Sequence, residues 1–206
     1  MLTWKIRFLL AELHLNSLLS QPTTGHLKEA LQSLPRGVEG LNEMYNRTME
    51  RVENHRQHSR VLAKQALAWL LYARRPLSTV EIASALAVQR NTAKIDESYL
   101  PSIDILSSLC AGLITVDQES KIVRLVHHTA QEYLQQTQTH WFPNGQTDIS
   151  STCITYLAFD SFKTGFCPTD ENFEERLRSN PLYDYAASNW GHHALEASMS
   201  AEHRRF

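Results

Sequence analysis

Three helical patterns followed by two short β-rich runs occupy the middle of this 206-residue chain. Apolar side chains recur at helical spacing in the first three segments, and the two later runs are rich in β-branched residues. A short polar turn, 117–120, separates those two runs and predicts a β-hairpin. The expected elements are helices 60–74, 78 to about 88 and 98–111, and strands 113–116 and 121–126.

Local signals fix the boundary between the first two of these helices. Pro76 disfavours helical geometry at Arg75 and ends the first helix. Ser78 and Glu81 have the spacing of a capping box, in which the Ser78 hydroxyl accepts from the amide at position 81 and Glu81 reaches back. The order helix, helix, helix, hairpin is that of a winged helix over about 60–126.

Helices are expected on both sides of this unit. Thr129 and Glu132 repeat the capping-box spacing and predict a helix from Thr129 to about His140. Asn180 and Pro181 read as a cap and first helical position. The other expected helices are 2–20, 26–34, 38–58, 148–160, 170–179 and 182–198. The predicted fold is mainly α with a small β-hairpin, divided into a helical region 1–58, a winged-helix domain 59–140 and C-terminal helices 146–200.

Apolar spacing predicts which side of each helix faces the core, and alternation is expected in the second strand at 122, 124 and 126. The inward residues are Leu41, Tyr45, Thr48 and Val52 on 38–58; Leu62, Ala66, Trp69, Leu70 and Ala73 on 60–74; and Leu100, Ile103, Leu106 and Leu109 on 98–111.

Composition excludes several classes of protein. Hydrophobic residues make up 42% of the chain, which rules out wholesale disorder. None of the seven glycines is followed by Lys-Ser or Lys-Thr, so the chain has no phosphate cradle, and no G-x-S-x-G nucleophile elbow occurs. Ten histidines include no H-E-x-x-H motif, and no metal or other cofactor is expected. Three cysteines without a CxxC pair favour a reduced, cytoplasmic protein, and no run is apolar enough to span a membrane.

A winged helix raises the alternative of DNA binding. The third helix of that fold usually enters the major groove, but 98–111 carries no cation and includes Asp104. Asp117 and Glu119 add negative charge at the turn of the hairpin. Phosphate contacts dominate DNA affinity, so DNA binding is disfavoured and no nucleic-acid partner is expected. The Arg-rich run 51–75 is either a solvated face or a docking surface for an acidic partner.

Several runs, taken in order, resemble the winged-helix region that follows the NACHT module in fungal NACHT–ankyrin proteins, a domain often labelled "GPI inositol-deacylase winged helix". The runs are Phe8–Leu18, Leu31–Pro35 with Tyr45, Ala66–Leu70, Ala73–Ser78 with Glu81, Leu109–Ile114, Val123–Leu134, Pro181–Ala187 and Trp190–His193. The signature residues carried by the resemblance are Trp69, Arg75, Pro76, Leu77, Ser78, Glu81, Thr129, Glu132 and Tyr133.

The resemblance implies a non-catalytic regulatory module that relays the nucleotide state of an NTPase module to ankyrin or similar repeats. The NTPase core and the repeats are absent from this sequence. The missing nucleophile elbow also disfavours a lipid-ester hydrolase, the activity that the domain label would suggest. The run 127–133 is similar to the H-x-S-F-Q-E-F motif of animal NOD-like receptors, which implies that His127 contacts an ADP phosphate when a NACHT module is present. The alternative is that His127 is a structural residue at the end of a strand.

Overall fold

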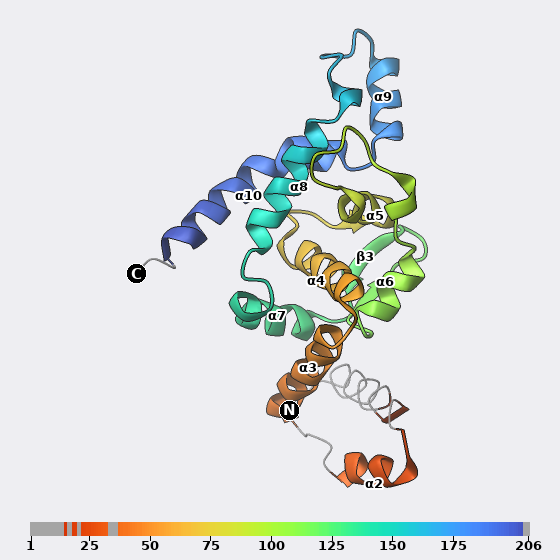
Figure 1. Ribbon diagram of the computed structural model, residues 1–206, viewed down its shortest axis with the longest axis vertical. Helices are drawn as coiled ribbons and strands as arrows, with labels where there is room; N and C mark the ends of the chain where they lie inside the picture. The colour runs from red at the N-terminus through yellow and green to blue at the C-terminus, as the bar shows by residue number, and fades with distance from the viewer. Residues whose placement is uncertain (1–14, 16–17, 20–21, 33–36, 204–206) are drawn as a thin grey trace.

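The computed structural model describes residues 15, 18–19, 22–32 and 37–203, and helices dominate this part of the chain (Figure 1). The helices are α2 (Thr24–Gln32), α3 (Gly37–Glu53), α4 (Gln57–Tyr72), α5 (Thr79–Ala87), α6 (Ile103–Leu109), α7 (His128–Trp141), α8 (Gly145–Leu157), α9 (Asp170–Ser179) and α10 (Tyr183–His203). The strands and 3-10 helices are β1 (Leu77–Ser78), η1 (Glu97–Tyr99), β2 (Ile114–Val116), β3 (Ile122–Leu125) and η2 (Asp160–Phe162). The mainly α fold is confirmed. The helix expected over 2–20 lies almost wholly outside the described residues, as does the end of the helix expected over 26–34.

The sheet has one strand more than the sequence predicted. β2 and β3 form the expected antiparallel hairpin, and β1 pairs with the other edge of β3, giving the order β1-β3-β2. A strand of two residues shows no alternation, and the sequence predicts only a helix that starts at Ser78. The alternation expected in the second strand at 122, 124 and 126 corresponds to the less buried face of β3. Arg124 on that face is exposed, whereas Val123 on the opposite face is buried.

Two predicted helices are shorter than expected. The segment 38–58 is divided, because α3 ends at Glu53 and α4 already begins at Gln57. Between them, the His55 ring Nε2 lies 3.1 Å from the carbonyl oxygen of Leu109. The third helix starts at Ile103 rather than 98, with the Ser102 hydroxyl as its N-cap. Leu100 therefore lies before the helix and is exposed, not inward.

Three helix starts also differ from the prediction. His127, not Thr129, is the N-cap of α7. Helix α8 begins at Gly145 rather than 148, and a Cβ on Gly145 would overlap the ring of Tyr72, so glycine permits this close approach to α4. Asn180 is the C-cap of α9, and α10 begins at Tyr183, so Pro181 lies in the turn between them.

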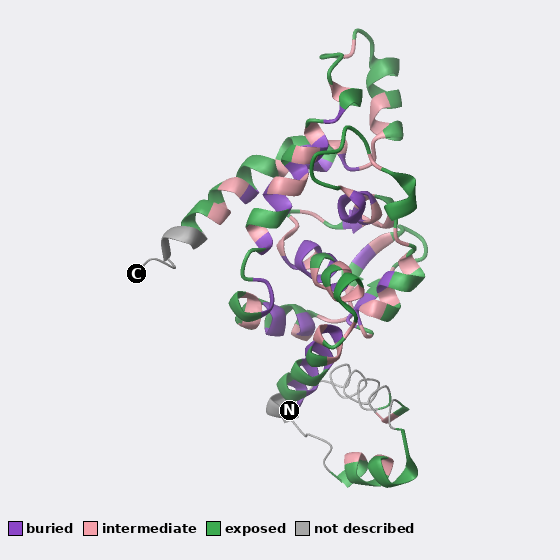
Figure 2. Ribbon diagram, in the orientation of Figure 1, coloured by how far each residue is buried: buried purple, intermediate pink, exposed green. Residues whose placement is uncertain are grey.

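One apolar core runs from α3 through the winged helix to the start of α10 (Figure 2). The inward residues predicted for α3 are all buried. On α4, Ala66 and Trp69 are buried, whereas Leu62, Leu70 and Ala73 are half-buried. On α6 only Leu106 is fully buried. Figure 1 shows α10 lying along α8, while α9 projects away from the core. Among the described helices, none has the length and apolar composition needed to cross a membrane.

Candidate functional site: the junctions that flank the winged helix

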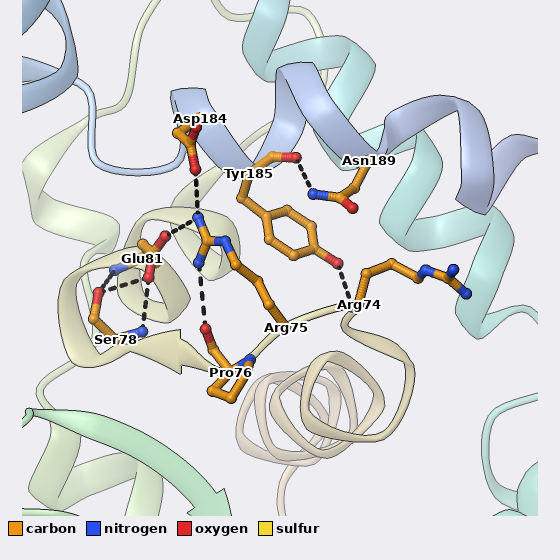
Figure 3. Close-up of polar contacts among 8 residues, drawn as sticks. All are labelled: Arg74, Arg75, Pro76, Ser78, Glu81, Asp184, Tyr185 and Asn189. Atoms are coloured by element: carbon orange, nitrogen blue, oxygen red, sulfur yellow. Dashed lines mark hydrogen bonds and ion pairs between the residues drawn. The ribbon is translucent and has the colours of Figure 1, made fainter.

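Arg75 lies at the corner between α4 and β1, where the chain turns toward the sheet. Its guanidinium Nη2 lies 2.7 Å from a carboxylate oxygen of Glu81 on α5 and 2.9 Å from one of Asp184 on α10 (Figure 3). Its Nη1 donates to the carbonyl of Pro76 at 3.3 Å, and the guanidinium carbon lies 5.2 Å from the ring centroid of Tyr185. One side chain thus joins the winged helix to the C-terminal helix.

Glu81 contacts Ser78 and Arg75 at the same time. Its Oε2 accepts from the backbone N–H and hydroxyl of Ser78, each at 2.8 Å, while its Oε1 faces Arg75. The Ser78 hydroxyl in turn accepts from the Glu81 amide, so the predicted capping box is confirmed. Burial alone would lower the pKa of Arg75, but its hydrogen bonds with Glu81 and Asp184 outweigh this and raise the pKa. The guanidinium therefore stays charged.

A closed ring of hydrogen bonds lies beside Arg75, around the buried imidazole of His193. The Arg74 amide donates to the Tyr185 hydroxyl at 3.1 Å, and that hydroxyl lies 2.8 Å from His193 Nε2. His193 Nδ1 lies 2.6 Å from Gln146 Oε1, and the Gln146 amide donates to Glu196. Arg74 Nη1 lies 3.5 Å from Glu196 and closes the ring.

The partners determine the protonation of His193. An amide oxygen only accepts, so Nδ1 carries the proton, and Nε2 accepts from the Tyr185 hydroxyl. A second proton would leave the hydroxyl facing two donors. Burial and the positive charges of Arg74 and His192 accordingly lower the pKa of His193 to about 4. Trp69 packs edge-on against Tyr185, at 5.5 Å between ring centroids. We call Trp69, Arg75 with its partners, and the ring of hydrogen bonds around His193 the α10 junction.

A second polar cluster, the α3 junction, joins α3 to α7. The Tyr45 hydroxyl lies 2.8 Å from the Thr129 hydroxyl, and the two rings of Tyr45 and Tyr133 are 5.2 Å apart. The Tyr133 hydroxyl donates to Asn46 Oδ1 and accepts from the indole N–H of Trp141 at 3.0 Å. Burial raises the pKa of both tyrosines, so these groups remain neutral donors and acceptors.

His127 stands at the end of this junction, in extended backbone before α7. Its Nδ1 accepts from the Thr129 amide at 3.3 Å and lies 2.9 Å from the Thr129 hydroxyl. The expected capping box of Thr129 and Glu132 is therefore wrong, because the Thr129 hydroxyl is engaged by Tyr45 and His127. A contact of His127 with a phosphate stays a prediction.

The structure separates the sequence-predicted site residues into these two junctions. The α10 junction contains Trp69, Arg75, Pro76, Ser78 and Glu81, with Leu77 buried beneath it in β1. Thr129 and Tyr133 belong to the α3 junction, while Glu132 is exposed. Sequence reasoning assigned no role to the partner residues Asn46, Gln146, Asp184, Tyr185, His193 and Glu196. A polar stripe on α10, at 185, 189, 193 and 196, is the signal that could have found three of them.

Other candidate chemistry is sparse. Burial raises the pKa of the Cys110 and Cys153 thiols to about 12, so neither is a nucleophile at neutral pH. The Asp117 carboxylate accepts from the amides of Glu119 and Ser120, which lowers its pKa and keeps the hairpin turn anionic. In the described ranges, no group of three or more His, Cys, Asp or Glu side chains could hold a metal ion.

The fold and these junctions define a winged-helix domain with a helix attached on each side. Residues 49–142 match the sequence profile of a family described as GPI inositol-deacylase, winged helix domain. The match includes the sheet, α4 to α7 and all nine signature residues, and it supports a winged-helix domain in this part of the chain. No curated protein and no solved structure matches the chain.

Proposed function

We propose that this chain is a non-catalytic regulatory module that relays the nucleotide state of a NACHT-type NTPase module to ankyrin or similar repeats. The observation that carries the proposal is the placement of Arg75, which holds α5 and α10 with one guanidinium. The winged helix is thereby coupled to the helix that follows it, while the α3 junction couples it to the helix before. A rigid-body shift on one side would strain the contacts on the other.

A non-catalytic role in the cytoplasm agrees with the chemistry of these residues. The chain carries no nucleophile elbow, and its two buried thiols have raised pKa values. We expect no cofactor in this chain and no nucleic-acid or membrane partner, since α6 carries Asp104 and no cation. Within this proposal His127 is the residue that faces an ADP phosphate when an NTPase module is docked, supported by its place at the start of α7.

The first test is to sequence the full-length transcript. An in-frame P-loop module upstream is the expected result, and ankyrin-type repeats are expected downstream. In the encoded protein, Arg75→Met should change the ADP dissociation rate by about tenfold, because it removes the charge that couples α5 to α10 and keeps most of the aliphatic stem. His127→Ala should speed ADP release.

A matched control is Arg178→Met, which removes an exposed arginine whose ion pair among the described residues is with Glu175 on its own helix. It should leave the dissociation rate unchanged. A transcript that encodes no NTPase would overturn the proposal unless a separate NTPase binds the chain. Equal ADP dissociation rates for the wild type and Arg75→Met would refute the relay even with the NTPase module present.

A further inference from the structure

A groove runs between α4 and α8. It consists of two adjoining cavities of about 290 and 740 Å³, which share Val61, Gln65, Leu86, Val88, Asp148 and Thr152. The first reaches the aromatic loop after α7, at Trp141 and Phe142, and the second reaches η1 and the start of α6. Trp69 also belongs to the α10 junction and Trp141 to the α3 junction, but Arg75, on which the proposed relay rests, does not line the groove.

Several large apolar side chains in the groove are exposed to solvent. Val61, Tyr99, Leu100 and Ile105 all line the second cavity, and their exposed fractions are 46%, 55%, 41% and 55%. Apolar side chains gathered in a groove mark an interaction site, whereas single exposed ones are normal. Strands β1 and β2 form the edges of the sheet, and neither lines the groove. The groove therefore recognises side chains rather than adding a strand.

Charge on the groove is positive toward both ends. Arg60 and Lys64 line only the first cavity, and Arg90 lines only the second. Glu53 pairs with both Arg60 and Lys64, at 4.0 and 3.0 Å. The carboxylate of Asp148 lies between the two ends, where burial raises its pKa and Arg90 opposes that shift.

We propose that this groove binds an acidic amphipathic helix of a partner protein. Apolar side chains of that helix would fill the middle of the groove, and its Asp or Glu side chains would meet Arg60 and Lys64 at one end and Arg90 at the other. A groove between two helices suits this helix-in-groove mode of recognition. The inference needs only the groove, so its failure would leave the relay intact, and the reverse also holds.

The test identifies the charge that the groove prefers in a ligand by selection from a library that contains acidic, basic and neutral peptides. A library of peptides of about 15 residues, with leucines on one helical face and Asp, Glu, Lys, Arg or Ser allowed at the flanking positions, is selected on the full chain. Acidic sequences should be enriched. Binding of the best labelled peptide is then measured by fluorescence anisotropy for the wild type and four variants, after circular dichroism shows that each is folded.

Val61→Asp should weaken binding by at least about tenfold, because it places a charge in the apolar floor. Val80→Asp is the matched control, since Val80 is 57% exposed on α5 outside the groove. Arg90→Glu should weaken binding by about tenfold and reduce its salt dependence. Asp148→Asn should tighten binding, because it removes the carboxylate that repels an acidic ligand.

Each alternative occupant has its own signature. Enrichment of basic peptides, with weaker binding by Asp148→Asn, would overturn the proposal in favour of a cationic ligand. Failure to enrich any peptide whose binding depends on Val61 would also overturn it. If light scattering shows a wild-type dimer and a monomeric Val61→Asp variant, a second copy of the chain covers the groove and the proposal is wrong.

Discussion

The two junctions attach a helix to the same winged helix, but they use different chemistry. At the α3 junction, the donors and acceptors are neutral hydroxyl, amide and indole groups, packed around two tyrosine rings. At the α10 junction, two arginines and three carboxylates surround a buried imidazole. Charge is therefore concentrated where the chain passes from the winged helix to α10.

This difference has a physical consequence. Interactions between ionised groups change with pH and ionic strength, whereas hydrogen bonds between neutral groups change little. The attachment of α10 should therefore respond to solution conditions that leave the attachment of α3 unaltered. In such a relay, the attachment of α3 would be insensitive to pH and ionic strength, and the attachment of α10 would respond to them.

The largest expected effect is that of Tyr185→Ala. Tyr185 is fully buried against Trp69, and its hydroxyl belongs to the ring around His193. Loss of this buried aromatic side chain should reduce the free energy of unfolding by about 3–5 kcal/mol, measured by urea denaturation. Tyr45→Ala should cost a similar amount, because burial rather than charge dominates at both junctions. Tyr99→Ala, at a tyrosine that is 55% exposed, is the control.

A cost below about 1 kcal/mol for Tyr185→Ala would mean that α10 does not depend on its first turn for docking, since that loss is typical of a surface substitution. The comparison would then fail, because only the α3 side would be a true junction.

The next effect is the pH dependence that the α10 junction contributes. His193 has an ordinary pKa of 6.5 when unfolded and a pKa of about 4 when folded, so the unfolded chain takes up the proton first. The stability contributed by neutral His193 is complete above pH 6.5 and is lost as the pH falls toward 4. A shift of that size corresponds to about 3 kcal/mol.

Urea denaturation from pH 7 to pH 4 measures this loss. His193→Gln should be less stable at pH 7 but should lose less stability on acidification than the wild type. His58→Gln replaces an exposed histidine and should retain the wild-type pH dependence. Equal pH profiles for the wild type and His193→Gln would show that the imidazole is not held neutral by its neighbours.

Local parts of this structure could be predicted from sequence, and long-range parts could not. The capping box of Ser78 and Glu81 depends on residues three positions apart, and it was predicted correctly. The bond from Arg75 to Asp184 joins residues 109 positions apart, and no periodicity reports such a pair. The winged-helix order was likewise predictable because the helices and hairpin follow one another along the chain.

The error at Thr129 has the same physical origin. Its spacing to Glu132 is that of a capping box, but Tyr45, 84 positions away, engages the Thr129 hydroxyl. A tertiary contact overrode a correct local preference and moved the cap to His127. The third strand was missed for a related reason, because β1 exists only through its pairing with β3.

The smallest effect compares Ser78, which belongs to a capping box, with Glu132, which does not. Ser78→Ala should reduce the free energy of unfolding by about 1 kcal/mol, because it removes the acceptor for the Glu81 amide. Glu132→Ala should change it by less than about 0.5 kcal/mol, since this exposed side chain caps nothing and surface changes are usually neutral. A cost for Glu132→Ala equal to that for Ser78→Ala would mean that α7 is capped in solution by the Thr129 box after all. His127 would then be released from its role as cap, and its Nδ1 would become available for another partner.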